Sequence, residues 1–235
     1  MTDPRLVQLE QRILAKNDDA ASALRDAFES TGTRVSNWVS SPGTGKTALL
    51  EALLTTAVSR GISAAALVGD CATDNDAVRL SRSGAPVRQI VTEGMCHLEA
   101  EMIAKHLVDL PLSQLELLVI ENVGNLVCPT SFDLGESSRV VLLSTVEGED
   151  KPLKYPATFA AADIVVITKV DLADAAGFDR AAAYDAIRTV NAGAPIVETS
   201  ARHAAGVDDL LELLLGSPTE QVTASAGAAS VHENH

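Results

Sequence analysis

The glycine-rich segment at residues 40–47, with the sequence SSPGTGKT, constrains the fold of this chain more than any other feature. It follows an apolar run at residues 35–39 and opens a helical apolar pattern at residues 48–58. This order of strand, turn and helix is that of a phosphate-binding P-loop. Ser40 stands at the first glycine of the G-x-x-x-x-G-K-S/T pattern, and the other fixed positions match. The alternative is a chance Gly/Ser turn before a helix.

A P-loop binds phosphate through backbone N–H groups, the positive end of the following helix and a few side chains. Lys46 would bring a mobile positive charge to the phosphates, and Thr47 would place its hydroxyl on Mg²⁺. The residues expected to contact nucleotide here are Pro42, Gly43, Thr44, Gly45, Lys46, Thr47 and Ala48.

Beyond this loop, short apolar runs alternate with helical patterns. Strands are predicted at residues 35–39, 63–68, 87–92, 115–120, 139–146, 163–167 and 195–198, and helices at 96–108, 178–190 and 210–215. Continuous apolar strands that alternate with helices predict a parallel sheet with both faces covered. The predicted fold class is therefore α/β, a single-domain P-loop NTPase with a mostly parallel sheet flanked by helices on both faces.

The two ends of the chain lack the alternation of strands and helices that is predicted for this central part. Residues 1–30 predict an N-terminal helical segment, as two helices or one kinked helix, because the polar residues 17–19 interrupt its apolar pattern. Residues 31–216 are assigned to the P-loop GTPase domain. Residues 217–235 are rich in Ser, Thr, Ala and Gly, lack a core pattern and are expected to be a disordered tail.

The composition narrows the function classes. A formal net charge of −14 argues against nucleic-acid or anionic-membrane binding, which relies on clustered Lys and Arg. No apolar run approaches the roughly 18 residues of a membrane span. The N-terminal stretch has no signal-peptide apolar region. With three cysteines and no export signal, free thiols and a cytoplasmic location are expected.

Two acidic residues are predicted to follow strands at the edge where ligands bind in parallel sheets. Glu121 can hold Mg²⁺ directly or through water, and Gly124 lets a backbone N–H approach a γ-phosphate. Asp70 is the candidate for positioning the attacking water, so Lys46, Asp70 and Glu121 form the expected catalytic set, with Asp70 and Glu121 also near Mg²⁺. For Glu121 and Gly124 alone, a plain turn is an equally good interpretation.

The segment Thr168-Lys169-Val170-Asp171 resembles the N-K-x-D element of GTPases, with Thr168 in place of Asn. Asp171 would accept from the guanine N1–H and exocyclic amine, and the stem of Lys169 would lie along the base. After the last strand come Ser200, Ala201 and Arg202, placed where GTPases back the guanine oxygen with backbone N–H groups. GTP is therefore favoured over ATP, although an ATP-using enzyme with an unrelated substrate stays open.

Cys96, His97 and Cys128 offer soft or borderline ligands suited to Zn²⁺ or Ni²⁺. Adjacent residues of a helix point about 100° apart, so Cys96 and His97 are awkward partners unless the backbone there is irregular. The alternative is that both cysteines are small core residues and His97 lies on the surface. Of the other Cys and His side chains, Cys71 is interpreted as a small buried thiol, His106 as a poorly placed co-ligand, and His232 and His235 as solvated residues of the tail.

Six segments together resemble the HypB family of GTPases, which help to load nickel into nickel–iron hydrogenases. They are SSPGTGKTALLE, GDCATDNDAVR, GMCHLEAEM, ENVGNLVCP, VEGEDKPLKYP and TKVDL, and the resemblance runs from about residue 13 to about residue 215. It implies a SIMIBI-class P-loop GTPase with slow, Mg²⁺-dependent hydrolysis. It also implies switch segments at Asp70 and Glu121 and a Ni²⁺ or Zn²⁺ site at Cys96, His97 and Cys128.

The resemblance further implies partners. These are a second copy of the chain on GTP binding, which could pool ligands from two chains, a HypA-type nickel chaperone and the hydrogenase large-subunit precursor. Residues 1–30 contain no Cys or His, so the extra N-terminal nickel site of some relatives is expected to be missing. Two alternatives remain: the urease nickel GTPase UreG, whose motif is Cys-Pro-His, and a metal-storage protein on a nucleotide-binding scaffold.

Overall fold

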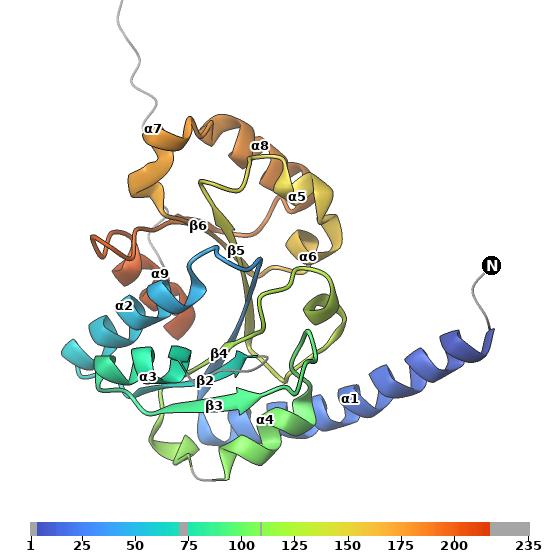
Figure 1. The fold of residues 1–235 in the computed structure, drawn as a ribbon. Coiled ribbons are helices and arrows are strands. Elements are labelled where there is room, and N and C mark those ends of the chain that lie inside the picture. The colour runs from blue at the N-terminus through green and yellow to red at the C-terminus, as the bar shows by residue number, and fades with distance from the viewer. Residues whose placement is uncertain (1–3, 71–74, 109, 217–235) are drawn as a thin grey trace, which may run out of the picture.

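The computed structural model describes residues 4–70, 75–108 and 110–216. Within them lies a seven-stranded, all-parallel sheet with the strand order β3-β2-β4-β1-β5-β6-β7 (Figure 1). The strands are β1 Arg34–Ser40, β2 Ala64–Asp70, β3 Val87–Val91, β4 Leu117–Glu121, β5 Ser138–Ser144, β6 Ile164–Thr168 and β7 Ile196–Glu198. Each predicted strand is present, and the predicted α/β class is confirmed.

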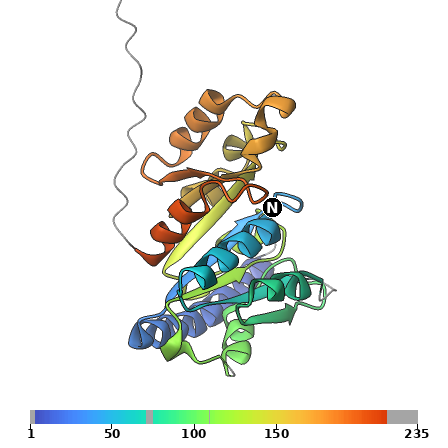
Figure 2. The same cartoon turned by 90° about the vertical axis from the view of Figure 1, so that its left-hand side faces the viewer.

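Helices cover both faces of this sheet (Figure 2). One face packs against α2 and α9, and the other packs against α1 and α4 at one end and α6 and α8 at the other. The helices are α1 Pro4–Thr31, α2 Lys46–Ser59, α3 Asn75–Leu80, α4 Ala100–Leu107, α5 Lys151–Lys154, α6 Pro156–Ala160, α7 Ala173–Ala176, α8 Arg180–Val190 and α9 Val207–Leu215. None of the helices in these described ranges has the length and apolar character that a membrane crossing needs.

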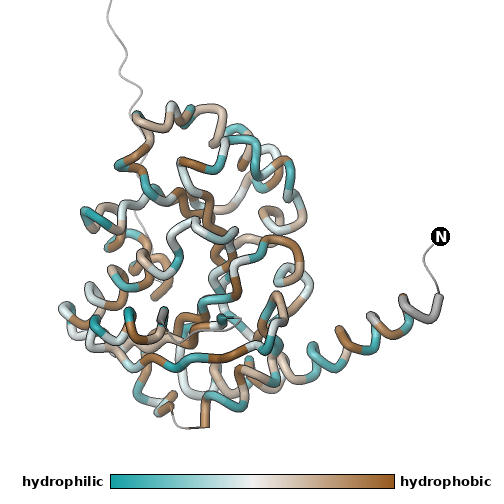
Figure 3. The backbone as a smooth tube through the Cα atoms, viewed as in Figure 1, coloured by the Kyte–Doolittle hydropathy of each residue, from teal (hydrophilic) through white to brown (hydrophobic). Residues whose placement is uncertain are grey.

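The sheet is apolar because both of its faces are covered. All five residues of β4 and of β6 are buried, and Figure 3 shows the apolar residues gathered along the central strands. β1 lies between β4 and β5, with Trp38 opposite Glu121 and Ser40 opposite Leu142. The carboxyl ends of the strands therefore meet at one edge, where polar side chains replace the apolar runs.

Helix α1 is a single helix and not two, and it projects beyond the sheet at its N-terminal end (Figure 1). Its second half is held by buried Ala21, Leu24 and Phe28. Asn17, where a break was expected, is 5% exposed and uses its side-chain amide for tertiary hydrogen bonds. A polar residue inside a helix is tolerated when its side chain bonds elsewhere and leaves the backbone ladder intact. The first half exposes Leu9 and Ile13.

One predicted helix begins later than the sequence pattern indicates. The pattern predicts a helix from residue 96, but α4 begins at Ala100 because Glu99 has an extended backbone. Side chains from other elements accept the local N–H groups, since Leu98 donates to Asn122 and Ala100 donates to Asn17. The predicted disordered tail, His232, His235 and Cys71 lie outside the described residues, and the domain boundaries at residues 30 and 216 stay predictions.

Candidate nucleotide and metal sites

The P-loop joins the central strand β1 to helix α2 by a turn that only glycine adopts easily. Gly43 has φ 77° and Gly45 has φ 101°, in the left-handed region that L side chains rarely enter. Gly45 directly precedes Lys46, the first residue of α2, so the N–H groups of the first helical turn face the strand edge. This arrangement is the anion site of a helix N-terminus.

Lys46 is almost completely buried and donates a hydrogen bond to Ser40 Oγ at 3.0 Å. The serine at the first P-loop position therefore holds the lysine at the strand end. Burial lowers the pKa of Lys46, and the nearby carboxylate of Glu121 opposes that shift. Because the positive charge of buried Lys46 is poorly solvated, an anion bound at the P-loop would stabilise it.

Glu121 ends β4 directly beside the start of α2. Its Oε1 accepts from Thr47 Oγ1 at 2.7 Å, while Oε2 is buried and has no hydrogen-bond partner among the described residues. Burial raises the pKa of Glu121 to about 7, although Lys46 and the Thr47 hydroxyl act in the opposite direction. An unpartnered carboxylate oxygen next to a threonine hydroxyl is a donor set that suits Mg²⁺. Asp70 ends β2, the neighbour of β4.

The loop after β4 lies against the P-loop. A Cβ on Gly124 would stand 3.1 Å from Pro42 Cα, which is tighter than an ordinary contact. On the other side, Glu147 accepts from Thr44 Oγ1 at 2.9 Å and from Ser144 N at 3.1 Å. Sequence reasoning assigned no role to Glu147. Its position just after a predicted strand, within VEGEDKPLKYP, was the available signal.

The predicted base-recognition segments meet beside the P-loop around a pocket of about 170 Å³. Lys169 Nζ donates to Gly43 O at 2.7 Å, and Thr168 Oγ1 donates to Thr44 O at 2.7 Å. The threonine that replaces the expected Asn thus ties this segment to the P-loop. The pocket is lined by Gly45, Ala48, Leu49, Thr168, Lys169, Asp171, Thr199, Ala201 and Arg202.

Asp171 is oriented by a neighbouring hydroxyl. Ser200 Oγ donates to Asp171 Oδ1 at 2.6 Å, and this bond lowers the pKa of Asp171, which keeps the carboxylate ionised as an acceptor. The backbone N–H of Ser200 is donated to Ala205 O, and Ser200 itself is buried. Ser200 therefore acts through Asp171, and it is Ala201 and Arg202 that line the pocket.

The structure brings Cys96, His97 and Cys128 together, with one ligand atom from each within 4.8 Å of the others. Cys96 Sγ lies 3.7 Å from His97 Nδ1. Irregular backbone at residues 96–99 removes the angular problem of adjacent helical residues. Cys96 is exposed, so the interpretation as a core cysteine is wrong for it. Two thiols and one imidazole fit a Zn²⁺ or Ni²⁺ ion and leave further coordination positions open.

The ring of His97 is held by packing. It stacks on Phe132 with ring centroids 3.9 Å apart, and its Nε2 lies 3.7 Å from Glu99 Oε1. Burial lowers the pKa of His97, which favours the neutral imidazole that binds metals. His106 Nδ1 instead contacts Met102 O within α4 at 2.8 Å, in line with its exclusion as a ligand.

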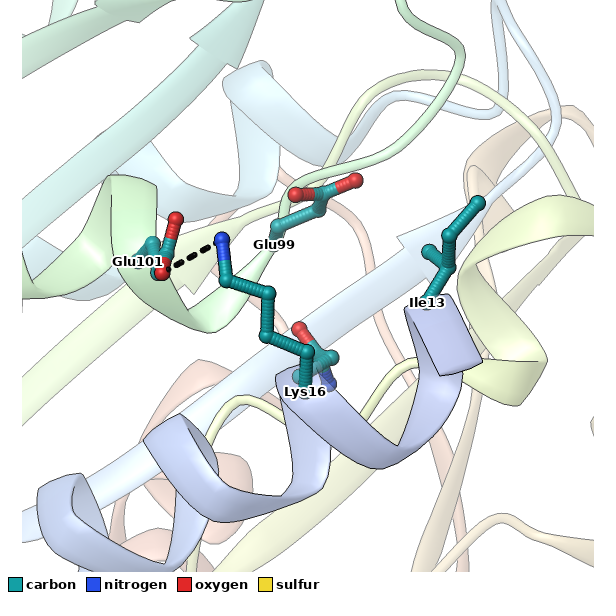
Figure 4. Close-up of a pocket in the computed structure, with 5 residues that line it drawn as sticks. Ile13, Lys16, Glu99 and Glu101 are labelled. Atoms are coloured by element: carbon teal, nitrogen blue, oxygen red, sulfur yellow. Dashed lines mark ion pairs between the residues drawn. The ribbon is translucent and has the colours of Figure 1, made fainter. Parts of the chain in front are cut away.

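Two pockets flank this cluster where α1 passes it. The larger, of about 590 Å³, is lined by Leu9, Ile13, Leu14, His97, Glu99, Val127, Cys128, Ser131 and Phe132. The smaller, of about 210 Å³, is shown in Figure 4, where Lys16 reaches from α1 to Glu101 at 2.9 Å. Glu99 lines both pockets.

These features are those of a P-loop nucleotide-binding protein with a separate cluster of two thiols and one imidazole that could hold a metal ion. Residues 35–198 match the family model described as CobW/HypB/UreG, nucleotide-binding domain. The chain is 44% identical over 211 residues to the hydrogenase maturation factor HypB of Azotobacter chroococcum mcd 1, covering 90% of this chain and 69% of that protein. It is 38% identical over 219 residues to the hydrogenase/urease maturation factor HypB of Helicobacter pylori, covering 91% and 89%.

A comparison with solved structures indicates the same family as these relatives. The chain resembles the crystal structure of HypB from Helicobacter pylori in complex with nickel with a TM-score of 0.80 and 38% identity, over 86% of this chain and 94% of that one. This chain therefore belongs to the HypB family of hydrogenase maturation factors. The resemblance inferred from the sequence motifs is confirmed, and the chain carries the nucleotide-binding GTPase domain of that family.

Proposed function

We propose that this protein is a Mg²⁺-dependent GTP hydrolase that assists nickel delivery into hydrogenase during its maturation, and that GTP-dependent dimerisation is coupled to metal binding. The observation that carries the proposal is the path from the P-loop to the metal cluster. Gly124 lies against Pro42, and Cys128 follows four residues later. A change in the nucleotide bound at the P-loop would therefore alter the structure close to a metal ligand.

The nucleotide roles follow from the donor sets. Lys46 offsets negative charge on the phosphates, and Thr47 with the unpartnered oxygen of Glu121 would hold Mg²⁺, which supplies positive charge to the transferring phosphoryl group when bound. Asp70 is the candidate for orienting the attacking water. Asp171 accepts from guanine, and a slow intrinsic turnover suits a switch.

The metal is the cargo in this proposal. Cys96, His97 and Cys128 would bind Ni²⁺, and Zn²⁺ suits the same ligands. Three ligands from one chain leave coordination positions that a second copy can fill by two-fold symmetry. The partners proposed for this cytoplasmic protein are a HypA-type nickel chaperone and the hydrogenase large-subunit precursor.

Delivery to urease is the second candidate, because the Helicobacter pylori relative carries hydrogenase/urease in its name. The same nickel-loaded state would serve both acceptors. The acceptor can be identified by adding the apo form of each enzyme to the nickel-loaded protein with GTP and measuring which of them gains metal.

Nickel titration in two nucleotide states tests the proposal. Wild type and Cys128→Ala are titrated with Ni²⁺ in the presence of GDP and of a non-hydrolysable GTP analogue. The wild-type Kd is expected to differ between the two states, and Cys128→Ala should weaken binding and remove that difference. His97→Ala should also weaken binding, whereas His106→Ala is its matched control. Unchanged nickel affinity of Cys128→Ala in both states would refute the coupling.

A further inference from the structure

The first of the two segments that carry metal ligands, residues 96–98, is fixed to the sheet. We name it the fixed arm. Leu98 is fully buried over Gly69, where an added Cβ would approach its side chain to 2.8 Å. The N–H of Leu98 donates to Asn122 Oδ1 at 3.1 Å, and Asn122 Nδ2 donates to Asn37 Oδ1 at 3.2 Å. The fixed arm is therefore tied to the middle of β1 and to the carboxyl ends of β2 and β4.

The second segment, residues 124–128, is held in another way, and we name it the loop arm. It begins at Gly124, against Pro42 of the P-loop, and ends at Cys128. Between them, Val127 is 62% exposed, and its N–H donates to Asn125 Oδ1 at 2.9 Å. The loop arm has no strand or helix before Cys128, and Leu126 is buried in the core, so Gly124 and Asn125 are the part of it that depends on the P-loop contact.

One side chain joins the two arms close to the metal ligands. Asn125 Nδ2 donates to Cys96 O at 3.3 Å, while the same amide holds Val127 through Oδ1. Asn125 is next to Gly124 in the chain and three residues before Cys128. It therefore contacts the ligand-bearing residue of the fixed arm from within the loop arm.

We propose that Asn125 is a positioning residue that transmits the nucleotide state to the metal site. This inference rests on the proposed coupling of nucleotide and metal. A γ-phosphate on the P-loop must be accommodated beside Gly124, which lies so close to Pro42 that an added Cβ would stand 3.1 Å from Pro42 Cα. Gly124 and Asn125 move with this contact, and the fixed arm does not follow because Asn122 and Leu98 hold it. The bond from Asn125 to Cys96 then differs between the two states, and with it the spacing of the two thiols.

Two variants of Asn125 separate its two hydrogen bonds. Asn125→Asp keeps an acceptor for Val127 N–H and removes the donor to Cys96 O, whereas Asn125→Ala removes both. Phe132→Leu is the matched control, because it loosens His97 without touching the link between the arms. Each protein is titrated with Ni²⁺ with GDP and with a non-hydrolysable GTP analogue, and the thiolate-to-nickel absorption band is recorded in each state.

The readout is the ratio of the two nickel Kd values. Wild type is expected to show a ratio of about 5- to 150-fold, the usual range of such coupling, with a band that changes with nucleotide. Both Asn125 variants should bring the ratio to about one and give one band in both states, while Phe132→Leu weakens binding equally in both. A wild-type ratio retained in Asn125→Asp would overturn the role of Asn125 and leave the proposed function intact. A wild-type ratio of one would refute the coupling itself, and the inference with it.

Discussion

The phosphate site and the metal site lie close together, but the chain builds them in different ways. At the phosphate site, side chains at the start of α2 bond to the ends of two adjacent strands, as Lys46 does with Ser40 of β1 and Thr47 with Glu121 of β4. At the metal site, the ligands lie outside the strands, on segments held by the amide of Asn122 and by one buried leucine each, Leu98 and Leu126. The first site is therefore preorganised by the sheet. The second lies on segments outside the strands and is therefore less firmly tied to the sheet.

The largest expected effect comes from Lys46→Ala. Removing the charge that faces the phosphates should lower the rate of GTP hydrolysis by about 100- to 1000-fold. Nickel affinity of the nucleotide-free protein should stay within about twofold, because the side chain of Lys46 bonds to Ser40 and not to any of the three metal ligands. Hydrolysis assays and nickel titrations check the two halves, with the exposed Lys154→Ala as control. A loss of nickel affinity in Lys46→Ala, in parallel with the loss of hydrolysis, would contradict the view that the two sites are built separately.

The second largest effect is the contribution of Glu121, at the phosphate site, to the pH dependence of the free energy of unfolding. The pKa of Glu121 lies at about 7 in the folded chain and near 4.5 in a free side chain. The folded state therefore binds this proton more tightly, and the free energy of unfolding falls as the pH rises from about 4.5 to about 7. The expected loss is about 3 kcal/mol.

Glu121→Gln removes that proton while keeping an acceptor for Thr47. Urea unfolding of the nucleotide-free protein at pH 5 and pH 8 should show the loss in wild type and not in the variant. The difference between the two proteins cancels the contribution of His97, whose lowered pKa acts in the opposite direction. Equal pH dependence in wild type and Glu121→Gln would mean that ionising Glu121 costs the folded chain no free energy. A Mg²⁺ ion beside Glu121 would then have no unfavourable burial of charge to offset.

The same contrast explains what could be predicted from the sequence. The strands and the P-loop were predictable because apolar runs and the spacing of glycine, lysine and threonine are local features. The helices α3, α5, α6 and α7 were not predicted. They span four to six residues, too few for a helical period to emerge.

The metal site needed information that spacing does not hold. Whether Cys96 and His97 can face one ion depends on where α4 begins. That start is set by Asn122 and Asn17, which accept N–H groups from across the molecule. Local pattern alone extends the helix to residue 96 and separates the ligands. Their residue types singled out Cys96, His97 and Cys128, and the family resemblance favoured this set over the core-cysteine alternative, because a family reflects contacts that the sequence pattern does not show.

The third prediction concerns the base end of the phosphate site. Asp171→Asn replaces an acceptor by an amide that also donates, so GTP binding should weaken by about 30-fold, in line with the loss of a charged hydrogen bond. Xanthosine triphosphate, which carries an oxygen in place of the guanine amine, should gain affinity. Competition binding with GTP, ATP and xanthosine triphosphate checks this, with Asp174→Asn on α7 as a surface control. Unchanged preference for GTP would remove Asp171 from base recognition.

The smallest expected effect lies at the metal site. Phe132→Leu removes the ring that stacks on His97 and should weaken nickel binding about fivefold, because such ring pairs contribute about 1 kcal/mol. Phe132→Tyr keeps the ring and should bind as wild type does. Nickel titration without nucleotide measures both variants. GTP affinity should be the same in each, because Phe132 contacts the fixed arm and the α1 side and not the P-loop. If GTP affinity also falls in Phe132→Leu, the contacts that hold the metal site also support the phosphate site, and the two sites are not built independently.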